Sequence, residues 1–463
     1  MAGPAHDSTT PAGDLPDPAL PAGTDRVPQV AHVVVLMMEN HSYDNYLGTL
    51  GRGDGLPDPG PVNLAQDGRP VTSHRMPSPR QVPRVPSQSW PASHEQYAQG
   101  GNDGFVASVE HLEPTADASL AMGYWTERDL PFYASLARTF PLADRWFCSC
   151  LGPTFPNRRF LIAGTANGLI DDAVASIIDY PKSGTIFDSL DRHGIDWANY
   201  HHVPGLRLLR HRAGGRGVLR FVRTAALLGR QLVPGMENVV RGEIRCTANL
   251  YPLGLRRTRR NVRHIREFFA RAAVGALPPF CIVDPDFERA SEENPQDVRL
   301  GEGFAAAVVN AVMSGPAWGC TLLIWLYDEH GGYYDHVPPP AAPEPDDVLP
   351  HSLVSGNGPL GWVLKHLGVA KASLPAHSDG RYDRYGFRVP AVVVSPFARP
   401  DHVSSTVYDH TSVLKLIEEK WNLPPLTRRD AAATAPWDML DFDNPPAFLT
   451  PPPLASPCVP WQP

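Results

Sequence analysis

The sequence predicts an α/β protein whose central, mostly parallel sheet is sandwiched between helices. Continuous apolar runs occur at 32–38, 280–287, 320–332 and 388–398, and amphipathic segments lie between several of them. Strands that are buried on both faces read as unbroken apolar runs rather than as alternating patterns. Strands that alternate with helices indicate a parallel sheet. In such a sheet, ligands bind at the carboxyl ends of the strands.

The remaining elements are expected in the following order. Residues 1–30 are rich in Pro, Ala and Asp and predict an extended arm, and 51–104 are rich in Gly, Pro, Ser and Gln and predict long loops. A strand is expected at 195–200. Amphipathic or capped segments predict helices, the first of them capped by Asp129, at 129–140, 185–194, 261–277, 301–315 and 411–422.

Composition excludes several classes of function. The chain has 463 residues and a net charge of −8, so as a whole it is not built to hold nucleic acid. Six cysteines without a CxxC pair make a thiolate zinc site a poor interpretation. The N-terminus lacks the basic start and apolar segment of a secretory leader. We therefore expect a cytoplasmic protein or an exported one whose leader has been removed, and the oligomeric state is left open.

Two apolar runs end in oxygen donors. Glu39 and Asn40 follow the first run, and Asp328 and Glu329 lie near the end of the third. Three carboxylates and an amide at the ends of core strands would repel one another unless a cation neutralised them. Hard oxygen ligands favour Ca²⁺, Mg²⁺ or Mn²⁺. The alternative is that each acid caps a helix or pairs with an arginine.

The stretch "LGPTFPNRRFLIAGT" places a hydroxyl in a constrained turn before a helical run. Thr154 is a weak nucleophile alone, but metal binding would make it competent at neutral pH. Asn157 could donate its amide to a phosphoryl oxygen, and Arg158 or Arg159 could complement the charge. The alternative is an ordinary turn in which the threonine caps the helix.

Four stretches together resemble the signature blocks of the phosphoesterase family, which includes bacterial phospholipases C and related acid phosphatases. They are "HVVVLMMENHSYDNYLG", "GPTFPNRRFLIAG", "LYDEHGGYYDHVPPP" and "RVPAVVVSPFA…TVYDHTSVLKLIEEKWNL". The resemblance implies an alkaline-phosphatase-like fold with an inserted cap region. It also implies a catalytic domain over 31–445, with a Pro-rich tail at 446–463.

The resemblance carries roles to individual positions. It implies one divalent metal ion, with Zn²⁺ or iron admitted beside Ca²⁺, Mg²⁺ and Mn²⁺. Thr154 matches the nucleophile that becomes phosphorylated, and Asn157 lies beside it in the "PNR" turn. His94 would contact phosphate or donate a proton, and His201 or His202 would be a further phosphate-site histidine. The implied metal ligands are Glu39, Asn40, Asp328 and Glu329.

One departure from the family pattern concerns the leaving group. Asn294 or Glu293 stands where the family usually has the histidine of a His-Pro pair. The missing imidazole puts in doubt the general acid or part of the phosphate clamp. Asp335 and His336 are expected to contact the metal ligands without binding the metal themselves, and His410 is expected to have a structural role.

Residues 205–245, within an expected insertion or cap over 205–260, are rich in arginine and leucine. One interpretation is a basic amphipathic segment that meets anionic lipid or substrate at the mouth of the site, giving peripheral membrane contact. The alternative is a cap whose arginines are solvated or paired with acids. The arginines are Arg207, Arg210, Arg212, Arg216, Arg220, Arg223, Arg230 and Arg241.

These observations predict a metal-dependent hydrolase of phosphoric esters that acts through a phosphothreonine, in the manner of a phospholipase C or a phosphatase. The substrate would be a phospholipid or a small soluble metabolite. The alternative from a different class is a binding protein that keeps the metal and a phosphate ligand but lost efficient turnover at the Asn294 position.

Overall fold

A computed structural model describes residues 13–80, 86–172, 179–202, 246–251, 259–351 and 381–462. The eight arginines expected in the insertion lie outside these ranges, so that prediction stays untested. Within the described ranges, no helix combines the length and the apolar character needed to cross a membrane.

One sheet of eight strands forms the core, in the order β12-β6-β11-β10-β1-β9-β7-β8. The central strand β1 (His32–Met38) pairs in parallel with β10 (Thr321–Tyr327) and β9 (Phe280–Val283), and all three are almost completely buried. The predicted α/β class with a mostly parallel sheet is confirmed. The outer strands are β7 (Trp197–His201), β8 (Val262–His264), β11 (Ala391–Val394), β6 (Leu142–Ala143) and β12 (Val403–Ser404).

Strand β11 runs antiparallel to both of its neighbours, β10 and β6. Its amino end therefore lies at the same edge of the sheet as the carboxyl ends of β1 and β10. Residues that precede β11 and residues that follow β6 consequently reach the edge where the acidic strand ends meet.

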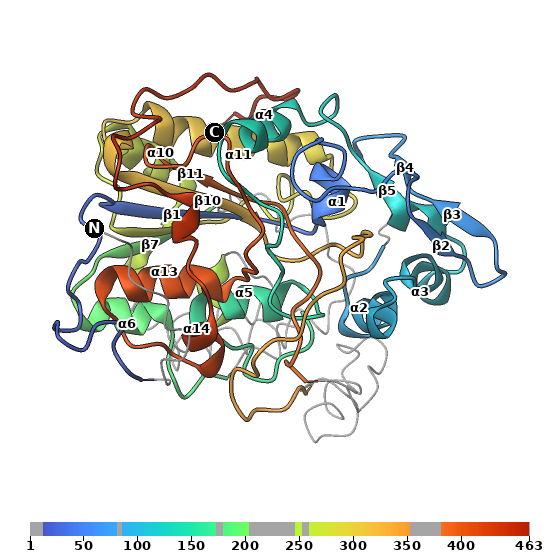
Figure 1. The fold of residues 1–463 in the computed structure, drawn as a ribbon, viewed down its shortest axis with the longest axis horizontal. Coiled ribbons are helices and arrows are strands. Elements are labelled where there is room, and N and C mark those ends of the chain that lie inside the picture. The colour runs from blue at the N-terminus through green and yellow to red at the C-terminus, as the bar shows by residue number, and fades with distance from the viewer. Residues whose placement is uncertain are drawn as a thin grey trace, which may run out of the picture.

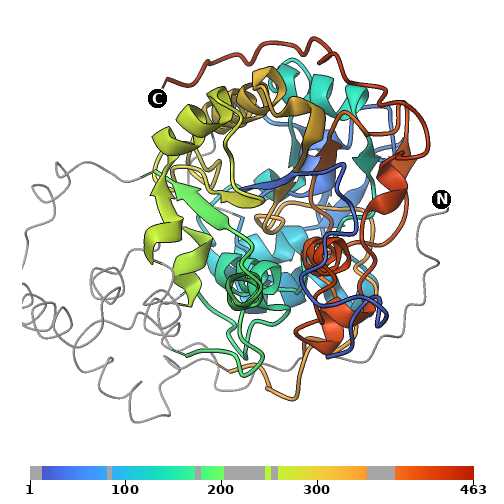
Figure 2. The ribbon, with the colours of Figure 1, turned by 90° about the vertical axis from the view of Figure 1, so that its left-hand side faces the viewer.

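Helices cover both faces of the sheet (Figure 1). Above it in that view lie α4 (Pro131–Thr139), α10 (Ile265–Ala273) and α11 (Val298–Ser314). Below it lie α5 (Thr154–Ala163), α6 (Ile186–Arg192), α13 (Thr411–Trp421) and α14 (Arg428–Ala432). Figure 2 shows the same two layers from the side. The predicted sandwich of helices around the sheet is thus present.

The prediction of loops throughout 51–104 was wrong. This region contains a hairpin of β2 (Val62–Leu64) and β3 (Pro70–Thr72), the short β4 (His74–Arg75) and the helix α2 (Trp90–Tyr97). With α1 (Tyr43–Leu47), β5 (Gly123–Tyr124) and α3 (Phe105–Leu112), these elements lie beyond one end of the sheet (Figure 1). Strands of two or three residues leave almost no periodic signal, and α2 tolerates Pro91 because proline fits the first turn of a helix.

Two helix starts differ from the prediction. The segment expected as a helix over 261–277 begins as strand β8, and His264 then caps α10 by accepting a hydrogen bond from Arg266 N at 3.1 Å. Asp129 does not cap α4, because its carboxylate accepts from Thr126 N at 3.0 Å and pairs with Arg75.

Both ends of the described chain pack on the domain. The arm at 13–30 meets the end of α13, where the Asn422 amide donates to Leu20 O at 2.8 Å. The tail at 446–462 crosses α11, and Trp461 stacks on Phe269 with ring centroids 5.2 Å apart. Gly303 in α11 lets the tail approach closely, because a Cβ there would lie 2.1 Å from Val459 O.

We expect Gly303→Ala to destabilise the protein by about 1–3 kcal/mol, because overpacking against the tail backbone outweighs the about 0.5–1 kcal/mol that alanine gains in a helix. Urea unfolding followed by far-UV circular dichroism measures the change. Gly319→Ala is the matched control, since a Cβ there meets only Leu449 Cδ1 at 3.7 Å. Equal stability of the two variants would contradict close packing of the tail.

Candidate active site

The register of the sheet brings the two acidic strand ends together. Met38 pairs with Tyr327 across β1 and β10, so Glu39 and Asp328 follow on adjacent strands. Asp328 N donates to Met38 O at 3.2 Å, and Asn40 N donates to Asp328 Oδ1 at 3.1 Å. Residues almost 290 positions apart in the chain therefore form one cluster. We call Glu39, Asn40, Asp328 and Glu329 the ligand cluster.

The Asn40 side chain links the ligand cluster to the threonine. One of its amide atoms lies 2.7 Å from Glu329 Oε1, 3.2 Å from Asp328 Oδ1 and 3.4 Å from Thr154 Oγ1. Its other amide atom lies 3.2 Å from Gln88 Nε2. With the nitrogen inward, the amide donates to both carboxylates. With the oxygen inward, four oxygens converge on one point, an arrangement that a cation stabilises.

The nucleophile candidate lies on a helix start that its own neighbours hold rigid. Thr154 is the first residue of α5 and is buried. Asn157 is fully buried, and its amide nitrogen donates to Gly152 O at 2.8 Å and Pro153 O at 3.1 Å. Its carbonyl oxygen accepts from Cys150 N at 3.0 Å. In this structure Asn157 therefore shapes the loop before Thr154, whereas the sequence suggested that it would donate to phosphate.

The side chain of Arg158, on α5, contacts the ligand cluster. It is 1% exposed, and its guanidinium donates to Asp328 Oδ2 and to Asp284 Oδ1, each at 2.8 Å. It also donates to Met38 O at 3.0 Å. Because these groups use its nitrogens, the structure gives Arg158 the role of neutralising buried acids, not the predicted contact with phosphate. The arginine alternative considered for the strand-end acids therefore holds for Asp328.

The site still has more negative charge than Arg158 offsets. Glu39, Asp284 and Asp328 all pair with this one guanidinium, and Glu329 adjoins Asp328. Glu39 Oε2 has no hydrogen-bond partner among the described residues. Burial raises the pKa of Glu39 well above its usual range, and burial together with Asp328 does the same for Glu329. A partnerless buried oxygen amid excess carboxylates is what a divalent cation would satisfy, so these residues fit a metal ion.

The structure places the predicted histidines on α2 and at the carboxyl end of β7. The His94 ring packs at a tilt against Trp90, with centroids 4.6 Å apart, and its Nδ1 lies 2.8 Å from Trp90 O. Trp90 in turn packs against Gly152 in the nucleophile loop. His201 ends β7, and its Nδ1 donates to His202 O at 3.1 Å. His202 Nε2 lies 3.6 Å from Asp286. The two residues thus lie at the carboxyl edge of the parallel strands, two strands from β1.

His410 is close to the ligand cluster. Its Nε2 donates to Asp328 O at 2.7 Å, and burial lowers the pKa of His410 to about 4. A neutral ring that holds a ligand backbone agrees with the structural role expected for it. Asn294, at the departure from the family pattern, accepts from Tyr333 OH at 2.6 Å.

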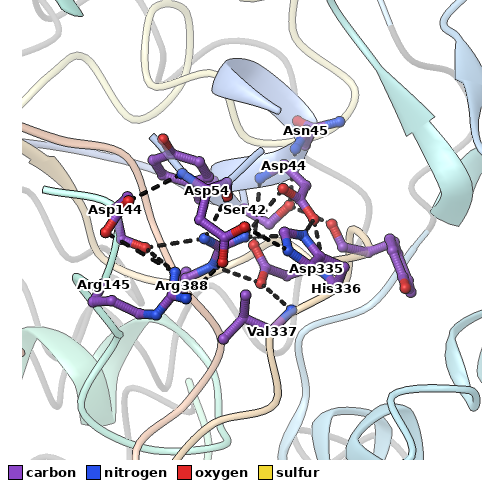
Figure 3. A network of polar contacts seen from close by, with 12 residues as sticks. Ser42, Asp44, Asn45, Asp54, Asp144, Arg145, Asp335, His336, Val337 and Arg388 are labelled. Carbon is purple, nitrogen blue, oxygen red and sulfur yellow. Dashed lines mark hydrogen bonds and ion pairs between the residues drawn. The ribbon is translucent and has the colours of Figure 1, made fainter. Parts of the chain in front are cut away.

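A second, largely buried polar network surrounds Arg388 (Figure 3). Arg388, just before β11, donates to Asp335 Oδ1 at 2.8 Å and to Asp44 Oδ1 at 3.1 Å. His336 donates its backbone N–H to Asp44 Oδ2 at 2.7 Å. Asp44, Asp335 and His336 have potential metal-ligand atoms within 4.8 Å of one another. The Arg388 guanidinium already supplies positive charge there. The network therefore joins the segment after Glu39 and Asn40 to the segment after Asp328 and Glu329.

Sequence reasoning missed several residues of the site. Asp284 follows strand β9 directly and could have been found as a third acidic strand end. Asp172 accepts from Phe155 N, in the first turn of α5, at 2.8 Å. Arg388 gave no local signal, because its importance follows from the antiparallel direction of β11.

Comparisons with known proteins identify the family of the chain. The model of the phosphoesterase family matches residues 30–424, a range that holds every member of the ligand cluster and Thr154. The chain belongs to the phosphoesterase family. Phospholipase C B of Mycobacterium tuberculosis (strain ATCC 25618 / H37Rv) is 30% identical to it over 96% of this chain and 82% of the relative.

Further relatives come from plants and other bacteria. Non-specific phospholipase C6 of Arabidopsis thaliana is 28% identical over 87% of this chain and 70% of the relative. Hemolytic phospholipase C of Pseudomonas aeruginosa is 28% identical over 88% of this chain and 54% of the relative. A solved protein of the alkaline phosphatase superfamily from Vibrio parahaemolyticus aligns over 89% of this chain and 71% of its own, with 9% identity and a TM-score of 0.38.

We expect Arg158→Met to cost about 3–5 kcal/mol of stability, because it leaves buried Asp284 and Asp328 without their cation. Chemical denaturation of the purified variant measures the loss. Arg158→Lys is the control, since it keeps the charge and should lose less. A loss of stability below about 1 kcal/mol in Arg158→Met is what an exposed ion pair contributes, and it would refute the role of Arg158 as a buried cation.

Proposed function

We propose that the protein is a metal-dependent hydrolase of phosphoric esters and that Thr154 is the nucleophile. The observation that carries this proposal is the convergence of polar groups on the Asn40 side chain. One amide atom of Asn40 lies within 3.4 Å of Asp328 Oδ1, Glu329 Oε1 and Thr154 Oγ1. Membership of a family whose relatives include phospholipases C supports the same class of reaction.

The ligand cluster and Thr154 would hold the cation, which when bound lowers the pKa of the threonine hydroxyl and offsets phosphate charge. Thr154 Oγ1 attacks phosphorus, the bond to the alcohol breaks, and water later hydrolyses the phosphothreonine. Thr154 also begins a helix of ten residues, whose amino end favours nearby negative charge, although the Phe155 N–H of its first turn already donates to Asp172. The helix start thus positions both the attacking oxygen and the anion.

The proton for the leaving alcohol comes from His94 in this proposal. Its Nδ1 must donate to Trp90 O, which only accepts, so Nε2 is the nitrogen left to exchange a proton. Burial lowers the pKa of His94, so the resting ring is neutral and Nε2 carries no proton. In this proposal Nε2 takes up the proton that the Thr154 hydroxyl releases on attack and passes it to the oxygen of the leaving alcohol. His201 and His202, at the end of β7, would complete the phosphate site.

The substrate would be a phosphate ester of a phospholipid or of a small metabolite. The phospholipase C names of the relatives favour a lipid, and the expected contact with a membrane surface would follow from that choice. The rival is a binding protein that retains cation and phosphate without turnover. It is favoured by Asn294, an amide that cannot act as the general acid a histidine would provide at that position.

We expect Thr154→Ala to abolish hydrolysis of p-nitrophenyl phosphate and bis(p-nitrophenyl) phosphate without loss of stability. The described partner of Thr154 Oγ1 is only the Asn40 amide, so its removal costs little in folding. Thr154→Ser keeps a hydroxyl and should retain activity. Chromogenic assays and thermal unfolding of all three proteins measure this.

Chelation is the companion test. EDTA should stop the wild-type reaction, and Mg²⁺, Ca²⁺ or Mn²⁺ should restore it. Mass spectrometry of protein quenched with substrate should find phosphate on Thr154. Full activity in Thr154→Ala would refute the nucleophile, and tight binding of phosphate with no turnover in the wild type would establish the rival.

A further inference from the structure

Glu292 is a buried carboxyl group held by three tyrosines. Tyr133 OH donates to Oε1 at 2.6 Å, and Tyr46 OH donates to Oε2 at 2.9 Å. Tyr327 OH makes a third, short hydrogen bond to Oε2. Glu292 is 0% exposed, and the three tyrosines come from α1, α4 and β10.

The chain makes special provision for this residue. Glu292 has a φ of +80°, a left-handed backbone conformation that a non-glycine residue adopts at a cost. Gly301 in α11 leaves space for its side chain, because a Cβ there would lie 2.1 Å from Glu292 Cγ. Strain of this kind persists only where the surrounding structure over-determines it, which indicates a constrained position.

Glu292 is linked to both pairs of candidate ligands. Tyr327, which donates to it, immediately precedes Asp328. His41, which immediately follows Asn40, donates through Nε2 to Glu292 O at 3.0 Å. The backbone oxygen of Ser291, the residue before Glu292, accepts a hydrogen bond from Glu39 N at 3.1 Å. The ends of β1 and β10, which carry the candidate ligands, are therefore both hydrogen-bonded to the Ser291–Glu292 segment.

Aromatic packing fixes the same connection. The His41 ring lies stacked against Tyr46 and Tyr333, with centroids 4.2 and 4.9 Å apart. Tyr333 in turn donates to Asn294. The segment 291–294 thus cannot shift without moving residues on both sides of the ligand cluster.

We propose that Glu292 is a positioning residue that sets the ends of β1 and β10, and so the spacing of the cation ligands. This inference rests on the proposed function, because it assumes that the ligand cluster holds a divalent cation. Groups that orient metal ligands without touching the ion commonly change metal affinity about 10–100-fold when removed.

Glu302 provides a matched control. It is also a buried glutamate, and it accepts from Phe132 N at 2.7 Å and from Tyr133 N at 3.4 Å. It therefore holds the start of α4, next to the same tyrosine, and its described hydrogen bonds do not reach the strand ends. Loss of either glutamate should destabilise the protein, but only loss of Glu292 should disturb the ligands.

The experiment is calorimetric titration of the full-length chain with Mn²⁺ alone, with thermal unfolding measured in parallel. We expect Glu292→Ala to weaken Mn²⁺ binding at least about tenfold and Glu302→Ala to leave it nearly unchanged at a comparable loss of thermal stability. Equal weakening in both variants, or none in Glu292→Ala, would overturn the inference.

Two gentler variants keep the test decisive if Glu292→Ala does not fold. Tyr327→Phe and Tyr133→Phe each remove one hydroxyl donated to Glu292, but only Tyr327 adjoins a ligand. Weaker Mn²⁺ binding in Tyr327→Phe alone supports the inference, and equal effects refute it. If the wild-type chain binds none of Mn²⁺, Ca²⁺ and Mg²⁺, the proposed metal-dependent function fails. If the wild type binds Mn²⁺ and the Glu292 variant binds it equally well, only the inference about Glu292 fails.

Discussion

The in-register pairing of β1 with β10 is the constraint on which the site depends. Side chains alternate along a strand, so a shift of one residue would turn Glu39 or Asp328 to the other face of the sheet. Both strands are buried on both faces, so a slip would also draw Glu39 or Asp328 into the apolar part of the sheet, which is costly for a carboxylate. The sheet therefore fixes the relative positions of the strand ends that carry the ligand cluster.

Buried charge is the cost of that geometry, and two arginines offset part of it. Arg158 lies among Asp284 and Asp328, and Arg388 lies between Asp44 and Asp335. Both guanidiniums make several hydrogen bonds, which is the condition under which buried ion pairs are tolerated. The difference between the two networks is functional. Arg388 satisfies its acids, whereas the ligand cluster keeps an unpartnered oxygen at Glu39 and faces Thr154.

Much of this arrangement could be predicted from the sequence because local patterns encode it. Unbroken apolar runs predict buried strands, and oxygen donors after such runs predict a site at the carboxyl edge, as found for Glu39 and Asp328. Residues whose roles depend on tertiary contacts could not be assigned in the same way. Asn157 and Arg158 are polar residues beside a nucleophile, and only the packed helix shows that one holds the loop and the other holds the acids.

Direction and distance explain the remaining omissions. Arg388 reaches the site because β11 runs antiparallel, and Glu292 reaches it through tyrosines on three separate elements. Neither relation is visible from composition or spacing. The short strands β2 to β5 were missed for a different reason, since two or three residues are too few to show a period of two.

The most direct test of the account is a crystal structure of the protein soaked with Mn²⁺, with the ion located by anomalous scattering. The account predicts a peak bounded by the side chains of the ligand cluster, Glu39, Asn40, Asp328 and Glu329, on the side that faces Thr154. An ion bound instead between Asp44, Asp335 and His336, or no ion at the β1–β10 edge at saturating Mn²⁺, would contradict it.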